Sequence, residues 1–267
     1  MHHARIPLLV LCLMAFGTPS ASAHGEFDES MLDEFHLHLD DFRADVQHLV
    51  EALEPVLETH AEHGDTDAAT AELIEEWEEV GVHAAIETRA TPLYPGIWQA
   101  LVALQQAAGS GRSAAEVRAA ADDVEAALWQ GFGAVRLAAS RVEAGTAPET
   151  AEAGDDPPRS GPETVDRIVA DLEQAVAAYR SDELERAEQL IHRTYLDRFE
   201  GLEGDLIARD AELVTRLERD FNATLPLLMQ QGAPLEEVNE TLASMKDRLE
   251  TARDILEEVE QSRSEVF

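Results

Sequence analysis

Apolar residues recur at intervals of three and four along almost the whole chain, the spacing that gives an α-helix one apolar face. The pattern predicts four helices before residue 144, over about 27–57, 67–88, 91–108 and 113–143. Pro92 suits the first turn of the third helix. Ser113 and Glu116 have the spacing of a capping box, which would start the fourth helix.

The stretch "AGTAPETAEAGDDPPRSGPE", residues 144–163, is rich in proline, glycine and acidic residues and has no helical period. We interpret it as a flexible linker. Periodic runs resume over about 164–180, from Asp182, from a helix cap at Asp210 and from Pro234. The predicted fold class is therefore all-α, with one antiparallel bundle of about four helices over residues 24–143 and another over residues 164–267.

The two halves also resemble each other in sequence. Residues 97–128 can be laid over residues 220–252, with a shared aromatic residue, spaced leucines, a paired glutamine, a glycine break and a Glu-Val pair that opens a long helix. Amphipathic helices produce such matches by chance as well. An internal duplication and two unrelated bundles therefore both remain open.

The first 23 residues have the features of a secretory signal peptide. Arg5 precedes an apolar run over residues 6–16, and Ala21-Ser22-Ala23 forms a cleavage site, which predicts an exported, periplasmic protein that begins at His24. The later apolar runs are too short to span a bilayer, so we expect no membrane-embedded segment. Cys12 is the only cysteine, and its loss with the signal peptide leaves no thiolate ligand.

The net charge of −35 narrows the range of partners. Nucleic acid is excluded because its phosphates would be repelled, and anionic membrane surfaces are disfavoured for the same reason. Cations and basic protein surfaces are attracted. Adaptation to a salty habitat would give the same acidity, so the charge by itself does not indicate a cation-binding role.

The stretch "HRTYLDRFEGLEGDL" combines metal-binding side chains with helical spacing. Residues three and four apart share a face of a regular helix, which predicts a stripe of His192, Tyr195 and Glu203 with Glu200 beside it. Carboxylates suit Fe(III), Mn and Ca, and an added imidazole suits Fe, Zn or Cu. Glu200 and Glu203 are the first candidate ligands, with His192 and Tyr195 as neighbours. Such glutamate pairs are also frequent on solvated helices of acidic proteins.

Histidines gather in the first half of the chain. In "ETHAEHGD", His60 and His63 lie three residues apart among acidic neighbours, and they form the second candidate metal site. Other pairs one helical turn apart are His38 with Asp41 and His83 with Glu87. The simpler interpretation of each pair is a set of exposed polar residues on an acidic helix.

The second half resembles a known family over about residues 165–260. "AYRSDELERA" is similar to an Ala-Tyr-x-x-Gly-Asp-x-x-x-Ala element, and "YLDRFEGLEGDL" to a Tyr-x-x-x-Phe-Glu-x-x-Glu-x-x-Leu element. "DAELVTRLERDF" resembles an Asp-x-x-Leu-x-x-x-Leu-Glu-x-x-Phe element, and "GAPLEEV" the Gly-Ala-x-x-x-x-Val opening of a last helix. In this order, the elements resemble the periplasmic helical domain of bacterial high-affinity iron permeases of the oxidase-dependent type.

The resemblance implies a free-standing periplasmic accessory protein of iron uptake. Such a protein would bind Fe2+, Fe3+ or a related divalent ion through carboxylates and histidines and deliver it to a membrane iron permease. Two features depart from the family. Asp182 and Glu183 occupy the Gly-Asp positions, and "RFEGLE" has one residue more than the Arg-Glu-x-x-Glu iron motif of the permease's transmembrane helices.

We expect no enzymatic activity from the sequence. Di-iron bundles use Glu-x-x-His pairs, and the nearest substitutes here carry the shorter acid, Asp33 with His36 and Asp45 with His48. The alternative function comes from a different class of protein. It is a metal-free helical module that binds a basic partner or serves as a scaffold in the cell envelope.

Overall fold

The structure is a computed structural model that describes residues 32, 34–62, 66–109, 111–145 and 160–265. The predicted signal peptide and most of the predicted linker lie outside the described residues. Within these ranges every regular element is helical and no strand occurs, so the predicted all-α class is confirmed. No helix in the same ranges is both long and apolar enough to cross a membrane.

The first half forms four successive helical segments. Its elements are η1 (Phe35–Leu37), α2 (Leu39–Glu51), α3 (Leu53–Glu62), α4 (Asp67–Glu79), α5 (Gly81–Arg89), η2 (Thr91–Leu93), α6 (Tyr94–Gly109) and α7 (Ala114–Glu143). The Ser113 side chain accepts a hydrogen bond from Glu116 N, and the Glu116 side chain accepts one from Ser113 N. The predicted capping box is therefore confirmed.

Two helices predicted as continuous are broken. The first divides at Ala52 into α2 and α3, and the second divides at Val80 into α4 and α5. Val80 has an extended backbone, with φ −89° and ψ 145°. The Asp45 carboxylate on α2 accepts a hydrogen bond from Val82 N at 3.0 Å, which satisfies one of the free amides at the start of α5.

The second half also forms four segments. Its elements are α8 (Gly161–Arg180), α9 (Leu184–Thr194), the π-helical η3 (Tyr195–Phe199), α10 (Glu200–Ile207), α11 (Ala211–Arg219), the π-helical η4 (Asp220–Thr224), α12 (Leu225–Gln230) and α13 (Leu235–Glu265). Helix α8 starts at Gly161 under a Ser160 cap, so it begins inside the predicted linker. The Asp210 side chain accepts a hydrogen bond from Leu213 N, which confirms the predicted cap of α11.

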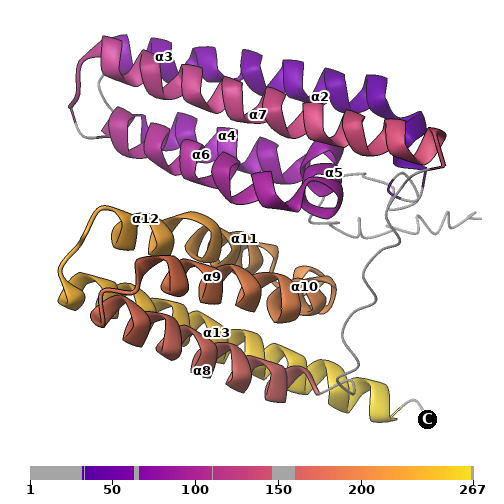
Figure 1. Cartoon of the computed structure of the whole chain (residues 1–267), viewed down its shortest axis with the longest axis vertical. Helices are drawn as coiled ribbons and strands as arrows, with labels where there is room; N and C mark the ends of the chain where they lie inside the picture. The colour runs from indigo at the N-terminus through magenta and orange to yellow at the C-terminus, as the bar shows by residue number, and fades with distance from the viewer. Residues whose placement is uncertain (1–31, 33, 63–65, 110, 146–159, 266–267) are drawn as a thin grey trace, which may run out of the picture.

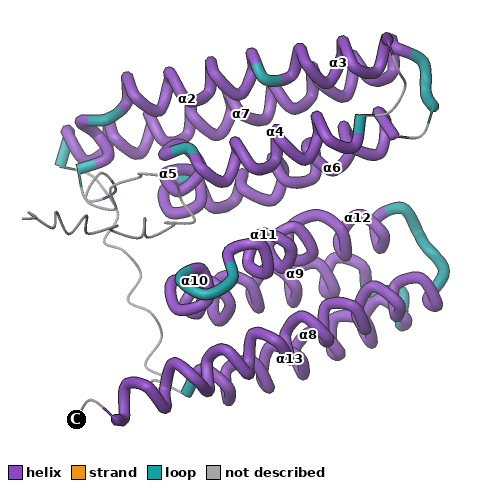
Figure 2. Tube along the Cα trace, turned by 180° about the vertical axis from the view of Figure 1, so that it is seen from behind, coloured by secondary structure: helices purple, strands orange, loops and turns teal. Residues whose placement is uncertain are grey.

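The segments are stacked so that the inner pair of one half faces the inner pair of the other (Figure 1, and from behind in Figure 2). In the first half α2–α3 and α7 lie outside, and α4–α5 and α6 lie inside. In the second half α8 and α13 lie outside, and the segments α9–η3–α10 and α11–η4–α12 lie inside. Both halves follow the same outer, inner, inner, outer order that a duplication would give, and the duplication itself remains a prediction.

A single apolar cluster runs through both halves. Its largest fully buried members include Trp77, Trp98, Phe199 and Phe221, all on the inner segments. Gly131 on α7 allows the helices to approach closely, because a Cβ at this position would lie 2.7 Å from the Ile86 Cδ1 atom. The two inner layers are therefore covered on both sides, and polar groups between them are shielded from water.

Candidate metal centre

Four glutamates are buried between the two inner layers. Glu78, Glu87 and Glu203 are 7–8% exposed and Glu218 is 1% exposed, and His83 among them is fully buried. Carboxylates are almost never buried without a compensating partner, because an unpaired charge is strongly disfavoured in an apolar interior. With Tyr94 and Tyr195, which are also fully buried, these residues make up what we call the buried centre.

The first half supplies its residues from the end of α4, from α5 and from the start of α6. Glu78 lies at the end of α4, immediately before the break at Val80, and His83 and Glu87 follow one turn apart on α5. Tyr94 is the first residue of α6. The break lets Glu78 and His83, which are five residues apart, share one site, a spacing that a straight helix would not bring to one face.

The second half supplies its residues around the two π-helical turns. Tyr195 opens η3, Glu203 follows on α10, and Glu218 lies near the end of α11, just before η4. A π turn places one extra residue in the helix and is frequent at functional sites. Here the two π turns lie beside the buried centre on adjacent helices.

Hydrogen bonds in the buried centre cross from one half to the other. The Tyr94 hydroxyl donates to Glu218 Oε2 at 3.1 Å, and the Tyr195 hydroxyl donates to Glu87. Each half thus contributes a tyrosine that binds a glutamate of the other half. The Thr215 hydroxyl on α11 also donates across, to Glu78 Oε2 at 3.2 Å.

An aromatic stack holds the imidazole and the phenols in place. His83 lies between Trp77 and Tyr94, with ring centroids 4.6 Å and 5.4 Å away. Tyr94 is in turn stacked on Tyr195 at 6.1 Å. The His83 Nε2 atom lies 2.7 Å from the Tyr94 hydroxyl. Side chains fixed in this way lose little further freedom when they bind a ligand.

Burial raises the pKa of every carboxyl group in the buried centre. The pKa of Glu78 rises to about 8 because of burial, with a smaller contribution from the charge of Glu87. The pKa of Glu87 rises to about 7, again mainly through burial. Burial and the neighbouring carboxylates raise the pKa values of Glu203 and Glu218 well above the ordinary range. Without a counterion, the group is thus expected to carry bound protons near neutral pH.

The same side chains form two sets with the spacing of a metal site. Ligand atoms of Glu78, His83 and Glu218 lie within 4.8 Å of one another, and so do those of Glu87, Glu203 and Glu218. In addition, Glu78 Oε1 and Glu203 Oε1 are buried and have no hydrogen-bond partner among the described residues. A buried carboxylate oxygen without a donor is what a cation would satisfy, so this cluster could hold a metal ion.

The structure brings together some of the residues predicted as ligands. Glu203 and Tyr195 belong to the buried centre, and Glu200 is half-buried beside it, where burial raises its pKa. His192 is half-buried and lines a separate surface pocket with Pro92 and Asn222. The π turn explains the separation, because an extra residue between His192 and Glu203 rotates them away from a common face.

The second predicted site lies elsewhere. His60 is on α3, and its Nε2 atom lies 3.0 Å from the backbone oxygen of Arg112, just before the cap of α7. His63 lies outside the described residues. In the part of the chain that the structure describes, His60 belongs to neither of the two sets of metal-binding residues.

Sequence reasoning did not assign Glu78, His83, Glu87 and Glu218 to one site. The spacing of His83 and Glu87 is visible in the sequence, but it is equally typical of an exposed helix. Glu78 lies in "EEWEEV", where four glutamates give no sign that one of them is buried. Glu218 lies in "DAELVTRLERDF", one of the elements on which the expected family resemblance rests, and that position was its only signal.

An acidic groove reaches the buried centre from the surface. It lies between α4 and α11 and is lined by Glu75, Glu78, Glu79, Glu212 and Thr215, together with Ala71, Ile74 and Ala211. Glu78 thus belongs both to this groove and to the centre, and Thr215 in the groove donates to it. A cation could approach along this route with carboxylates on either side.

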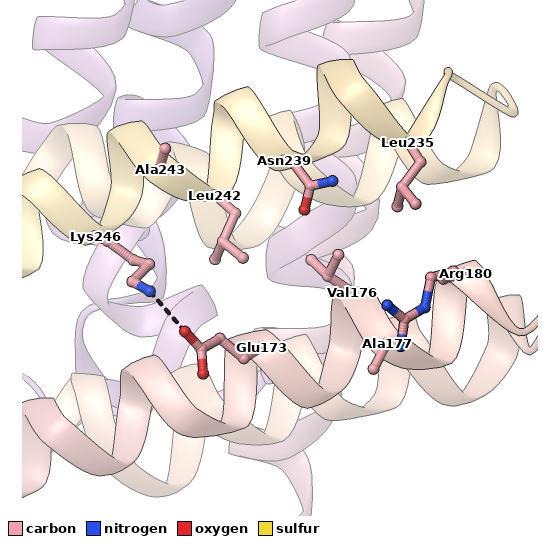
Figure 3. A pocket seen from close by; sticks show the side chains of 9 residues that line it. All are labelled: Glu173, Val176, Ala177, Arg180, Leu235, Asn239, Leu242, Ala243 and Lys246. Carbon is pink, nitrogen blue, oxygen red and sulfur yellow. Dashed lines mark hydrogen bonds and ion pairs between the residues drawn. The ribbon is translucent and has the colours of Figure 1, made fainter.

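A second groove lies on the far side of the second half and contains no candidate ligand. Figure 3 shows it between α8 and α13, with Lys246 and Glu173 paired across it. The Lys246 Nζ atom lies 2.6 Å from Glu173 Oε1. Apolar side chains such as Leu242 and Val176 form much of the rest of its surface, and nothing about it indicates a metal.

Comparisons of the chain with known protein families, with curated proteins and with solved structures found no match. The function of the buried centre is therefore argued from its own chemistry.

Proposed function

We propose that the chain binds iron, or a related divalent ion, in the buried centre and acts as a periplasmic accessory protein of iron uptake that delivers the ion to a membrane permease. The proposal is supported by the buried carboxylate and imidazole groups. It is also supported by the resemblance of residues 165–260 to the periplasmic domain of iron permeases. Glu203 and Glu218 belong to both lines of argument.

One observation carries the proposal: two carboxylate oxygens of the buried centre, Glu78 Oε1 and Glu203 Oε1, have no donor in the described structure. A structural hydrogen-bond network would leave such groups paired, because an unsatisfied buried acceptor costs about 1–3 kcal/mol. These two groups share the buried centre with an imidazole and two further carboxylates, and together they indicate a site for positive charge.

The donor set favours iron or manganese over softer metals. Four carboxylates are hard oxygen ligands, and the single imidazole extends the preference toward iron, zinc and copper. Iron suits both donor types. Helical bundles that hold iron use a similar number of glutamates projected inward from facing helices.

Delivery requires that the ion be released as well as captured. The acidic groove would raise the local cation concentration at the mouth of the site. Protons would compete with the metal for the glutamates, whose pKa values are raised. Ligands made of oxygen and imidazole exchange in this way more readily than thiolates.

The test is a calorimetric titration of the chain without residues 1–23, using Fe(II) under anoxic conditions and Mn(II), Zn(II) and Cu(II) for comparison, at an ionic strength of about 0.15 M, where surface charges are screened. We expect saturable Fe(II) binding. The variant Glu78→Gln/Glu203→Gln should lose it while its circular dichroism remains helical.

The matched control is Glu236→Gln/Glu237→Gln, which removes the same charge from exposed positions on α13. The control should bind as the wild type does. If the wild type takes up ions only weakly and the uptake disappears with salt, the proposal is wrong. The buried centre would then be a protonated network that fixes the two halves together, and the metal-free interaction module would be the better account.

A further inference from the structure

We propose that the buried centre holds two cations, bridged by the carboxylate of Glu218. This inference rests on the proposed function and adds the number of ions and the role of the bridging residue. It follows from the way in which the seven side chains of the centre divide into two groups.

The two sets of metal-binding residues share one member. Glu78 and His83 join Glu218 in one set, which we call the His83 set; Glu87 and Glu203 join it in the other, which we call the Glu203 set. A carboxylate has two oxygens and can give one to each of two ions. Glu218 is also the most deeply buried of the four glutamates, at 1% exposure, as expected of a residue between two sites.

Each set also has its own tyrosine. The Tyr94 hydroxyl contacts both His83 and Glu218, so it belongs with the His83 set. The Tyr195 hydroxyl donates to Glu87, so it belongs with the Glu203 set. Both hydroxyls point to carboxylates that would become ligands. Each could orient its carboxylate as the outer hydrogen bonds of metal sites do.

Charge balance favours two divalent ions when the four glutamates are ionised. The four glutamates carry a charge of −4 when ionised, and two divalent ions neutralise it. A single divalent ion would leave two negative charges that only protons could neutralise, and buried charge without a partner is strongly unfavourable. Among the described residues, no lysine or arginine is buried in the centre to replace the second ion.

The two positions should differ in their preference for metals. The His83 set has two carboxylates and one nitrogen donor, so it accepts Zn or Cu as well as Fe or Mn, whereas the Glu203 set offers only oxygen donors and suits Mn or Fe. Fe(II) and Mn(II) are therefore the ions that we expect to fill both. Two ions that share a carboxylate would lie roughly 3.5–4 Å apart, as in other two-metal sites.

The experiment measures how many Mn(II) ions bind per chain and whether they interact. The chain without residues 1–23 is dialysed against Mn(II) at about 0.15 M salt, the bound metal is counted, and electron paramagnetic resonance shows whether the ions are magnetically coupled. We expect two ions per chain and a coupled spectrum. Both measurements are made on the wild-type chain, so neither requires a variant to fold.

Variants then assign the ions to the two sets. His83→Asn should leave one uncoupled ion in the Glu203 set, and Glu87→Gln should leave one uncoupled ion in the His83 set. Glu218→Gln should weaken both and abolish the coupling. Glu236→Gln, on the exposed face of α13, should bind two coupled ions as the wild type does.

One tightly bound, uncoupled ion per wild-type chain would overturn the two-ion proposal and leave the proposed function intact. Two ions whose signals are uncoupled would also overturn it, because a shared Glu218 carboxylate requires neighbouring ions. No saturable binding at all would contradict the proposed function itself, so the two failures are distinguishable.

Discussion

The glutamates of the buried centre represent a compromise between stability and binding at the level of single residues. Glu203 is 7% exposed and one of its oxygens has no hydrogen-bond partner in the described structure. In the metal-free protein such a residue must hold a proton or bury a charge, and both reduce the free energy of unfolding near neutral pH. Residues that lower stability in this way are typical of sites that bind a ligand.

The first prediction concerns Glu203→Gln. Glutamine keeps the shape of the side chain and removes the ionisable group, so the metal-free variant should unfold at a higher temperature than the wild type at about pH 8. Its metal affinity should fall at least about 100-fold, because changes even to outer hydrogen-bonding residues lower affinity about 10–100-fold. Thermal unfolding with a chelator, and titration without one, measure the two effects. A variant that is less stable and binds normally would contradict the account.

The second prediction concerns the pH dependence of the metal-free protein. The folded-state pKa values of Glu78 and Glu87 are about 8 and about 7, whereas an unfolded glutamate titrates at about 4.3. Between these values the folded state binds more protons than the unfolded state. The stabilising contribution is therefore complete below about pH 4 and is lost as the pH rises through 7 and 8.

Urea unfolding in the presence of a chelator at several pH values between about 5 and 8 measures this dependence, with a slope of up to about 1.4 kcal/mol per pH unit for each excess proton. The variant Glu78→Gln should show a shallower slope, because one of the titrating groups is gone. A free energy of unfolding that is constant or rises over this range would show that the buried glutamates do not titrate as proposed.

The ends of individual helices were predicted well where residue types at fixed offsets mark them. Interruptions within a periodic run were not predicted. The capping box at Ser113 and the cap at Asp210 follow from residue types at fixed offsets, and the structure confirms both. The extended backbone at Val80 lies immediately before Gly81, and a single glycine within a periodic run did not suffice to predict the break. The break depends on Asp45, which lies on another helix and caps α5, and contacts of that kind are not encoded in local sequence.

The π turns limited the prediction of the site in the same way. The sequence analysis used regular helical spacing to align His192, Tyr195 and Glu203. The π turn at 195–199 changes that register, so Tyr195 and Glu203 point into the centre while His192 lines another pocket. Tyr195 and Phe199 of this turn pack against Phe221 of the other π turn, and a tertiary contact of this kind leaves no simple pattern in the sequence.

The third prediction concerns the turn between α8 and α9. Asp182 has a φ of 63° and is the only non-glycine residue with positive φ in the described ranges. Asp182→Gly should therefore raise the free energy of unfolding by up to about 1 kcal/mol, since glycine adopts this conformation without strain.

Denaturant unfolding measures the change. Ser181→Gly is the matched control, because Ser181 has a φ of −92° in the same turn, where glycine only adds freedom to the unfolded chain. It should lower stability slightly. Equal effects of the two substitutions would mean that the left-handed conformation at Asp182 carries no strain.

The fourth prediction concerns the groove between α4 and α11. The double variant Glu75→Gln/Glu79→Gln removes two exposed carboxylates from its walls. Cation binding should become several-fold slower at low ionic strength, because electrostatic attraction accelerates association, and the difference should shrink at higher salt. Stopped-flow measurement of Mn(II) binding tests this.

The control for the groove is again Glu236→Gln/Glu237→Gln, which removes the same charge from α13. Its association rate should remain close to that of the wild type. If both double variants are slowed equally, the acidic surface acts as a whole and the groove is not a preferred route.

The buried centre is a property of the whole molecule. Each of the two sets of metal-binding residues includes side chains from both halves, and the hydrogen bonds from Tyr94 and Tyr195 cross between them. Neither half contains a complete set. Metal binding should therefore tie the two halves together and raise the stability of the whole chain by about 2.7 kcal/mol at a free-ion concentration of 100 times the dissociation constant.

This arrangement also explains why the site was only partly predictable. Sequence patterns place Glu203 and Glu218 on helices of the second half, and Glu78 and Glu87 on helices of the first. They do not show that the inner segments of the halves face each other. Amphipathic periodicity indicates which face of a helix is buried but not which other helix packs against it. The candidates Glu200, Glu203 and Tyr195 therefore point to the right helix, while the residues from the other half were missing.

The most direct test of the central claim is a crystal structure of the chain without residues 1–23, loaded with Mn(II) or Fe(II), with an anomalous difference map recorded at the absorption edge of the metal. The account predicts two peaks in the buried centre, one on each side of the Glu218 carboxylate, at distances of roughly 2.0–2.6 Å from its ligand oxygens. Peaks confined to surface carboxylates, with none among Glu78, Glu87, Glu203 and Glu218, would contradict it.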